Sequence, residues 1–319
     1  MHFLLIDFGA SYITSILFNK ESDSFSDLKA INSPFITTDK LSKDEIYSII
    51  KNILNQYKSA QAVVMCGILG GNYLNNIYYS WKCNEQTGKP TEESCLLSEL
   101  FKDQPTYHLH SHHSKNSAIK GLQLLGYINN VKFYSSLGDT NCVIESVNLK
   151  TNELLINLGT GSQVIKRNED GTHNIISFIP SGRALNSFKV FFDSLGVNLF
   201  DEFAKLNIND LEQSTLIFDL NIFPQSFKFK GGGLIKNIDE NNFNVRNFIS
   251  SLFRSYIDQY IEIIKTNKID TIYFAGGISK KYPLIQKYIQ HKTDIYTQIS
   301  SFQYEDTHIG MSNLIKQYL

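Results

Sequence analysis

The stretch ELLINLGTGSQVIKR, residues 153–167, contains two apolar runs separated by a turn of glycine, threonine and serine. Runs rich in leucine, isoleucine and valine on both sides of such a turn predict a β-hairpin. The N-terminal stretch MHFLLIDFGASYITSILFN, residues 1–19, follows the same plan, with IDFGAS at its turn. We therefore expect two equivalent hairpins, each opening one half of the chain.

The segments outside these hairpins alternate between strand and helix patterns. AVVMCGI from Ala62 and VKFY from Val131 predict strands, and IDTIYFAGGISKKYPLIQKYI from Ile269 predicts a strand, a Gly-Gly turn and a helix. The closing HIGMSNLIKQYL predicts a short packed helix. Helical patterns also occupy residues 42–57, 120–127, 141–147, 184–206 and 244–265. This alternation is typical of an α/β fold.

The length favours two domains. The chain has 319 residues, and a single domain usually has roughly 100–200. We place an N-terminal domain at residues 1–153 and a C-terminal domain at residues 154–319. Hydrophobic residues make up 42% of the chain and charged residues 19%, which is the composition of a folded protein rather than a disordered one.

Charge and composition exclude several classes of partner. The chain has 30 basic and 31 acidic residues and a net charge of −1, so it lacks the basic excess that nucleic-acid binding needs. No apolar run approaches the ~18 residues that span a bilayer, and Asp7 interrupts the first run too early for a signal peptide. The four cysteines form no C-x-x-C pair, which indicates reduced thiols. We expect a cytoplasmic protein without a membrane partner, and leave a homodimer open.

Three turns of small residues, each after an apolar strand, carry the candidate chemistry: Asp7–Ser11, Gly159–Ser162 and Ala275–Ser279. In each turn backbone N–H groups can face an anion, glycine lets a phosphate approach closely, and hydroxyls can bond its oxygens. One such turn is weak evidence, but three in this order favour a phosphate-containing ligand. The pattern G-x-x-x-x-G-K-[ST] does not occur, because Gly231-Gly232-Gly233 leads into Leu234, and this excludes a P-loop NTPase.

These motifs together resemble the FGGY carbohydrate kinases of the actin/hexokinase/Hsp70 superfamily, with a closer likeness to sedoheptulokinase. IDFGAS is similar to the first phosphate motif of that family, INLGTGSQ to the second, FAGGISKKYPLIQKYI to the adenosine motif, and GDTNCVIES to the segment with the catalytic aspartate. The resemblance implies two ribonuclease-H-like, actin-type domains with a nucleotide cleft between them. It also implies ATP and Mg²⁺ as cofactors and a ketose, heptulose or polyol as the acceptor.

The resemblance assigns roles to individual residues. Asp139 would be the base that accepts the proton of the sugar hydroxyl, and Asp7 would hold Mg²⁺ through water. Phosphates would contact Gly9, Ala10, Ser11, Gly159, Thr160, Gly161 and Ser162, and the adenine-ribose site would be lined by Gly276 and Gly277. The residues alone leave alternatives open, because Asp139 also suits a turn or a helix N-cap and Asp7 suits a hairpin turn.

The sequence departs from the family pattern at two places. The usual Asp-x-Gly-Thr is here Asp7-Phe8-Gly9-Ala10, with Ser11 as the nearest hydroxyl. The sugar-contacting Trp-x-Asp-x-Arg stretch appears as WKCNE, residues 81–85, without the aspartate or the arginine. Trp81, Asn84 and Gly138 are candidate substrate contacts, although a single tryptophan also suits packing. These departures support a second hypothesis, a non-catalytic nucleotide-binding module that acts as a sensor or scaffold.

A histidine cluster, HLHSHH at residues 108–113, raises the question of a metal site. His108, His110, His112 and His113 could share a strand face, but no cysteine or acidic residue nearby completes a zinc-ligand spacing. We favour a polar loop that touches substrate.

Overall fold

The computed structural model describes residues 1–9, 12–33, 43–67, 71–74, 77–80, 122, 124–134, 139–222, 232–300 and 303–319. The chain divides into two compact units. Unit 1 comprises Met1–Asn148 together with Gln303–Leu319, and unit 2 comprises Leu149–Phe302. Ala10, Ser11, Trp81, Asn84, Gly138 and the cluster His108–His113 lie outside the described residues.

Unit 1 contains a six-stranded sheet in the order β3-β2-β1-β4-β8-β7. β1, β2 and β3 are joined as antiparallel neighbours, β4 and β8 run parallel to β1, and β7 pairs antiparallel with β8. The strands are β1 (His2–Phe8), β2 (Tyr12–Asn19), β3 (Ser24–Asn32), β4 (Ala62–Gly67), β7 (Leu124–Ile128) and β8 (Val131–Tyr134). A separate hairpin joins β5 (Gly71–Leu74) to β6 (Ile77–Ser80).

Unit 2 contains a five-stranded sheet in the order β11-β10-β9-β14-β15. Its first three strands are antiparallel neighbours, and β14 and β15 run parallel to β9. The strands are β9 (Glu153–Leu158), β10 (Ser162–Arg167), β11 (His173–Ile179), β14 (Thr271–Ala275) and β15 (Tyr296–Ile299). Because β1 to β4 and β8 of unit 1 have the same order and directions, the two hairpins do open equivalent α/β sheets, as predicted.

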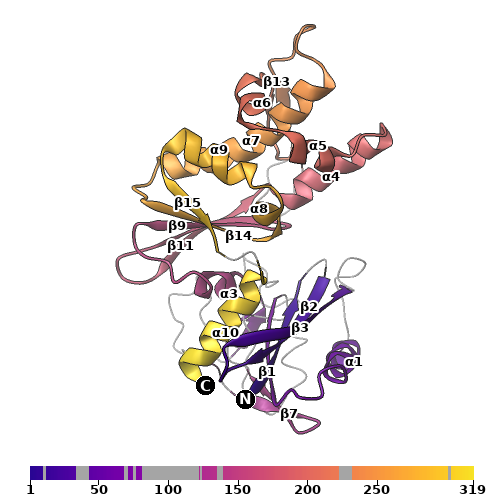
Figure 1. Ribbon diagram of the computed structural model, residues 1–319, viewed down its shortest axis with the longest axis vertical. Coiled ribbons are helices and arrows are strands. Elements are labelled where there is room, and N and C mark those ends of the chain that lie inside the picture. Colours follow the sequence, from indigo (N-terminus) through magenta and orange to yellow (C-terminus); the bar gives the residue numbers. More distant parts are fainter. Residues whose placement is uncertain are drawn as a thin grey trace. The chain divides into compact units, whose positions relative to one another are not determined.

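Helices cover both faces of the sheet in unit 1 (Figure 1). Side chains alternate along β1, so that Leu4, Ile6 and Phe8 pack toward α1 (Lys43–Leu54). Phe3 and Leu5 pack instead with residues of α10 (Asp306–Tyr318). The two-residue period of a strand therefore supplies both cores of this unit from one apolar run. The short helix α3 (Asp139–Glu145) lies beside α10.

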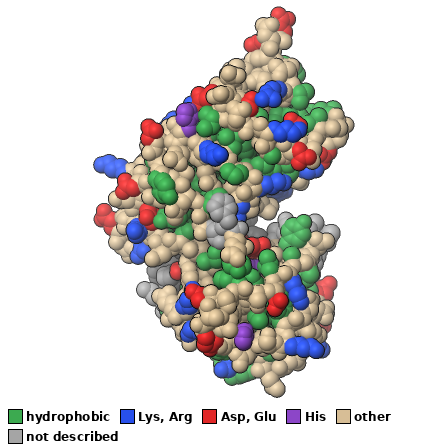
Figure 2. All heavy atoms as spheres, in the orientation of Figure 1, with side chains coloured by type: hydrophobic (Ala, Val, Ile, Leu, Met, Phe, Trp, Pro, Cys, Tyr) green, Lys and Arg blue, Asp and Glu red, His purple; other side chains and the backbone are tan. Residues whose placement is uncertain are grey.

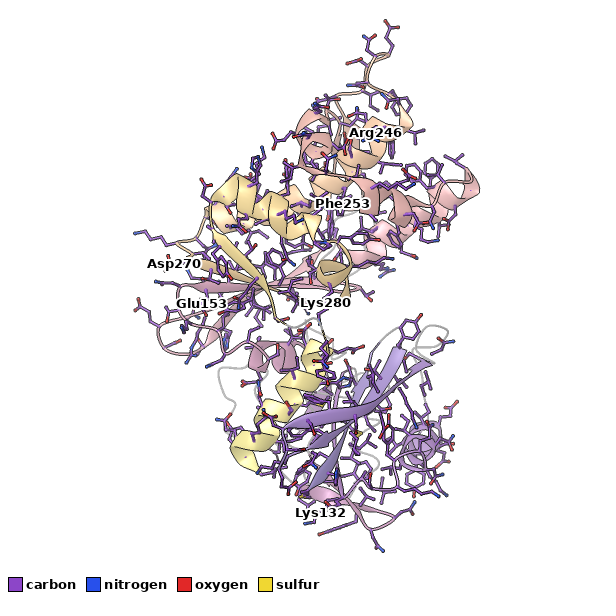
Figure 3. The ribbon with its side chains drawn as sticks, viewed as in Figure 1. Lys132, Glu153, Arg246, Phe253, Asp270 and Lys280 are labelled. Carbon is purple, nitrogen blue, oxygen red and sulfur yellow. The ribbon has the colours of Figure 1, made fainter. Side chains whose placement is uncertain are left out.

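The helical layer of unit 2 is built around α7 (Val245–Lys265). Asn244 caps this helix by accepting a hydrogen bond from the Asn247 amide, and the apolar stripe from Leu252 to Ile264 is buried, as its spacing predicts. Figure 1 shows α7 and α9 (Leu284–Thr293) on the same side of the sheet, and Figure 3 shows Phe253 inside this layer. The other elements of the unit are α4 (Gly182–Ser194), α5 (Leu199–Lys205), α6 (Ile208–Gln213), α8 (Gly277–Lys281), α9 (Leu284–Thr293), β12 (Ile217–Phe218) and β13 (Ile235–Lys236).

One element differs in type from the sequence prediction. Residues 124–127, predicted as helix, belong to the edge strand β7, which pairs with β8. Asn129 and Asn130 between these strands have φ angles of 50° and 66°, and two such residues form the tight turn that matches strand twist in a hairpin. The turn therefore overrides the weak helical spacing before it.

The division of the chain also differs from the predicted boundary at residues 153 and 154. The segment Gln303–Leu319 belongs to unit 1 rather than to the second half. Met311, Leu314 and Ile315 of α10 bury their side chains against β1, β2 and β4, and this amphipathic face draws the C-terminus back to the first sheet. Unit 1 is therefore made from both ends of the chain.

The surface shows no segregation of charge on the face in view. Figure 2 shows acidic and basic side chains interspersed over each unit. No helix among the described residues is long and apolar enough to cross a membrane. The two cysteines that the structure describes, Cys66 and Cys142, are free and buried.

Candidate functional site

Asp7 is the penultimate residue of β1, and its side chain is 9% exposed. The Thr307 hydroxyl donates a hydrogen bond of 2.8 Å to Asp7 Oδ2. The other oxygen, Oδ1, is buried and accepts no hydrogen bond from the described residues. A buried carboxylate oxygen without a partner is rare in proteins, and one explanation for it is an ion or water that binds there.

Burial raises the pKa of Asp7 to about 7. The negative charges of Glu305 and Asp139 act in the same direction. The Thr307 hydroxyl lowers the pKa, as does the nearby Cys66 thiol, although that weak donor makes no regular hydrogen bond to Oδ1. Near neutral pH this carboxyl is therefore partly protonated, and a bound cation would favour its charged form.

Asp139 is the first residue of α3 and its side chain is exposed. The Thr140 amide donates a 2.6 Å hydrogen bond to Asp139 Oδ1, so the first turn of the helix holds this oxygen. Asp139 lies close enough to Asp7 for its charge to raise the pKa of that residue. Both predicted carboxylates therefore belong to unit 1, and the Asp139 side chain is exposed.

The N-terminal end of α10 contributes polar residues that the sequence did not single out. The Thr14 hydroxyl of β2 donates a 3.1 Å hydrogen bond to Glu305 and lies 3.4 Å from His308 Nε2. Burial lowers the pKa of His308 to about 4, so its ring is neutral at physiological pH. The signal for this group was the run of polar residues at the start of an otherwise apolar helix, but nothing in the sequence places it beside Asp7.

A glycine lets α10 approach α3 closely. A Cβ atom built on Gly310 would lie 1.7 Å from the carbonyl oxygen of Cys142. This distance is too short for any side chain, so the position requires glycine. At the far end of α3, Asn313 Nδ2 donates a 2.9 Å hydrogen bond to the Glu145 carbonyl. These contacts fix α3, and with it Asp139, against α10. The same helix bonds Asp7 through Thr307.

The predicted phosphate turn of unit 2 joins β9 to β10. The Gly159 amide donates to the Gly161 carbonyl at 3.0 Å, and the amides of Gly182 and Arg183 donate to the carbonyls of Gly159 and Thr160 at 3.1 and 2.9 Å. Thr160 and Gly161 are exposed, and a Cβ atom on Gly161 would meet nothing within 4 Å. Hydrogen bonds to the start of α4 therefore fix the backbone of this turn, while Thr160 and Gly161 stay exposed.

Ser162 does not expose its side chain as a phosphate contact would require. It is 1% exposed, and its hydroxyl donates to the Ile179 carbonyl at 3.1 Å and lies 2.8 Å from the Tyr260 hydroxyl. Ser181 makes an equivalent 3.0 Å bond to Tyr256 and also bonds the Gly159 carbonyl. The side chain of Ser162, at the start of β10, points into the core. Its hydroxyl links the turn to Tyr260 of α7.

The Gly-Gly turn follows β14, which is the strand next to β9. Gly276 has a φ angle of 86°, and its Cβ atom would lie 2.4 Å from the Leu158 carbonyl oxygen. Glycine is therefore required there by the backbone, whereas Gly277 faces open space. In unit 1, Gly9 is restricted in the same way by the Tyr12 carbonyl, 2.7 Å from its Cβ position.

Both turns of unit 2 lie at one end of its sheet. β9 and β14 are parallel neighbours, so their carboxyl ends meet at the same edge. Figure 3 shows Lys280 at this end, with Glu153 and Asp270 at the opposite end. Ligands of open α/β sheets generally bind at the carboxyl ends of the strands.

Magnesium is the only metal that the predicted site calls for. Among the described residues no group of three or more histidine, cysteine, aspartate or glutamate side chains could hold a metal ion. The unpartnered Oδ1 of Asp7 is nevertheless a hard oxygen donor of the type that Mg²⁺ prefers, and Mg²⁺ commonly keeps most of its waters and uses one or two carboxylates. The residues fit a cation held through water.

Solved structures with this architecture include sugar and polyol kinases. Xylulose kinase from Lactobacillus acidophilus aligns with a TM-score of 0.64 over 98% of this chain and 88% of that chain, at 10% identity. Glycerol kinase from Plasmodium falciparum, solved with ADP, aligns with a TM-score of 0.63 over 99% and 88%, at 10% identity. The fold is that of the sugar and polyol kinases.

The same fold also occurs in proteins of another class. The activator of 2-hydroxyisocaproyl-CoA dehydratase from Clostridium difficile, solved with ADPNP, aligns with a TM-score of 0.51 over 99% of this chain and 94% of that chain, at 9% identity. No protein-family model matches the sequence, and no curated protein matches it. At these identities the comparisons establish the fold, and function rests on the site.

Proposed function

We propose that the protein catalyses the ATP-dependent phosphorylation of a hydroxyl group on a small carbohydrate, a ketose, heptulose or polyol. The observation that carries the proposal is the pairing of Asp7 with Asp139 in unit 1. One carboxylate is buried with an unpartnered oxygen, and the other is exposed at a helix start near enough to interact with it electrostatically. Phosphoryl transfer from Mg·ATP uses one group that holds the cation near the phosphates and another that accepts the proton of the attacking hydroxyl.

Asp139 acts as the general base in this proposal. As the sugar hydroxyl oxygen forms its bond to the γ-phosphorus, its proton passes to the Asp139 carboxylate and the bond from phosphorus to the β-phosphate oxygen breaks, releasing ADP. The exposed side chain can reach an acceptor, and the Thr140 amide holds one of its oxygens in place. General-base catalysis of this kind contributes roughly 10²–10⁴-fold to the rate.

The other predicted residues bind rather than react. Asp7 holds Mg²⁺ through water, and the cation neutralises charge on the transferred phosphate. The backbone of Gly159, Thr160 and Gly161 contacts phosphates with its open face, and Gly277 lines the adenine-ribose site beside the structural Gly276. The roles of Ala10, Ser11, Trp81, Asn84 and Gly138 stay predictions from the sequence.

The test separates proton transfer from binding by replacing Asp139 with Asn. This change keeps the size of the side chain and an oxygen for the Thr140 amide, but it removes the base. We expect turnover with an accepted sugar to fall by roughly 10²–10⁴-fold while the Kd for Mg·ADP, measured by calorimetry, stays within about threefold. Asp44→Asn, at an exposed aspartate in the first turn of α1, is the matched control and should leave both quantities unchanged. Parental turnover in Asp139→Asn would remove this residue from the mechanism.

A nucleotide-binding module without kinase activity is the second candidate. Two observations favour it: Ala10 replaces the usual threonine of the first phosphate motif, and the fold also occurs in a dehydratase activator solved with a nucleotide. This candidate predicts Mg·ADP binding without any sugar-dependent ADP release. The same assays therefore distinguish the two.

A further inference from the structure

The contact between Thr307 and Asp7 joins opposite ends of the chain. The two residues are 300 positions apart, and their 2.8 Å hydrogen bond is buried. Thr307 is 8% exposed and Asp7 is 9% exposed. None of the three predicted turns includes Thr307, so the bond adds a group to the candidate site that its motifs do not contain.

This bond determines which way the Asp7 carboxylate faces. The terminal torsion of an aspartate is broad and roughly two-fold, so an unrestrained carboxylate samples many orientations. Thr307 donates to Oδ2, and Oδ1 is the atom that has no partner among the described residues. Holding one oxygen therefore presents the other in a single direction.

The helix that carries Thr307 is itself fixed. Gly310 lies against the Cys142 backbone of α3, with no room for even one methyl group, and Asn313 bonds the Glu145 carbonyl at the end of that helix. Met311 and Leu314 of α10 are buried in the apolar cluster that also contains Cys142. The hydroxyl of Thr307 therefore has little freedom to move away from Asp7.

We propose that Thr307 is a positioning residue for the cofactor site, whose hydroxyl holds Oδ2 of Asp7 so that Oδ1 is left to bind the water shell of a nucleotide-bound Mg²⁺. The inference rests on the proposed function for the identity of the cation. It assigns to the C-terminal helix a part in metal binding, beyond its part in the core of unit 1.

The test measures the affinity of the protein for Mn²⁺, a paramagnetic substitute for Mg²⁺, in the presence of saturating ADP. Electron paramagnetic resonance reports free Mn²⁺ directly and needs no sugar acceptor. In Thr307→Val, which keeps the side-chain shape but lacks the hydroxyl, we expect Mn²⁺ affinity to fall about tenfold or more, the size expected for losing a hydrogen bond to a charged group. Affinity for ADP in EDTA should not change, because Thr307 is not placed against the nucleotide.

Two further variants separate positioning from general stability. Thr307→Ser restores the hydroxyl and should bind Mn²⁺ within about threefold of the parent. Ser312→Ala removes another buried hydroxyl of α10, one that bonds the Ile309 carbonyl of its own helix, and should also retain parental Mn²⁺ affinity. If Thr307→Val does not fold, Thr307→Ala takes its place beside Thr307→Ser. Parental Mn²⁺ affinity in the variant without the hydroxyl, or no ADP-dependent Mn²⁺ binding by the parent, would overturn the inference. Thr307-dependent Mn²⁺ binding without phosphorylation of any sugar would instead overturn only the kinase proposal.

Discussion

At the scale of single residues, burial moves two titratable groups of unit 1 in opposite directions. The pKa of Asp7 rises from 3.8 to about 7, mainly because burial disfavours its charged form. The pKa of His308 falls from 6.5 to about 4 for the same reason. Burial thus favours the uncharged form of both side chains, and each contributes to the free energy of unfolding in a way that depends on pH.

The raised pKa of Asp7 predicts that this carboxyl lowers the free energy of unfolding at high pH when no cation is bound. Its pKa is raised in the folded state, so its stabilising contribution is present below pH 3.8 and is lost as the pH rises through about 7. We therefore expect Asp7→Asn to be more stable than the parent at pH 8 in EDTA, by about 1–3 kcal/mol, because each tenfold change in proton affinity corresponds to about 1.4 kcal/mol. At pH 5 the difference should be smaller, because Asp7 then stays protonated in the folded protein and only the unfolded chain has lost the proton.

Urea unfolding at the two pH values measures this difference. The opposite contribution of His308, lost as the pH falls from 6.5 toward 4, is common to both proteins and cancels in the comparison. An advantage of the variant that is equal at pH 5 and pH 8 would show that the ionisation of Asp7 is not its cause.

The sequence identified some residues of the candidate site and missed others for a physical reason. Asp7 lies near the end of a strand and Asp139 at the start of a helix, both in recognisable motifs, and the structure places them in one unit. Thr307 and His308 have only a weak local signal, the polar start of an otherwise apolar helix, and their partners Asp7 and Thr14 lie about three hundred positions away. Only the packing of α10 on the first sheet reveals them.

At the scale of elements, the two glycine turns of unit 2 contrast a glycine that the backbone needs with one that a ligand would need. Gly276 must be glycine because of its positive φ angle and the adjacent Leu158 carbonyl. Gly161 has neither restriction, since its Cβ position is free of neighbours within 4 Å. If this turn binds phosphate, a side chain at Gly161 would occupy the space of the ligand without disturbing the protein.

We therefore expect Gly161→Val to weaken Mg·ADP binding about tenfold or more while leaving the free energy of unfolding within about 0.5 kcal/mol of the parent, the range of substitutions away from packed features. Gly276→Ala is the contrasting variant and should lower stability by about 1–3 kcal/mol, as overpacking does. Calorimetry and urea unfolding measure the two effects. Parental ADP affinity in Gly161→Val would mean that the turn is only structural.

Element types were predictable where periodicity was long, and unpredictable where a turn decided the outcome. The 21-residue helix α7 agrees with its predicted span of residues 244–265, because its apolar residues recur at helical spacing over several turns. β7 was predicted as helix because its spacing is ambiguous over five residues. The positive φ angles of Asn129 and Asn130, which settle the hairpin, are a property of the folded backbone.

At the scale of the whole molecule, the repeated hairpin plan in the sequence predicted the duplicated sheet topology that both units share. The boundary was less predictable, since the return of Gln303–Leu319 to unit 1 depends on long-range packing. The duplicated fold is shared with sugar kinases and with a dehydratase activator, so fold alone does not decide between catalysis and nucleotide binding.

The most direct test of the proposed activity is the detection of a phosphorylated sugar. The protein is incubated with Mg·ATP and a panel of ketoses, including heptuloses, together with aldoses and polyols, and the products are followed by ³¹P NMR, with Asp139→Asn in parallel. We predict that at least one ketose, heptulose or polyol yields a sugar phosphate in a one-to-one ratio with ADP, and that the variant yields about 10²–10⁴-fold less per unit time. Firm Mg·ADP binding by calorimetry, with no sugar phosphate from any member of the panel, would contradict the account.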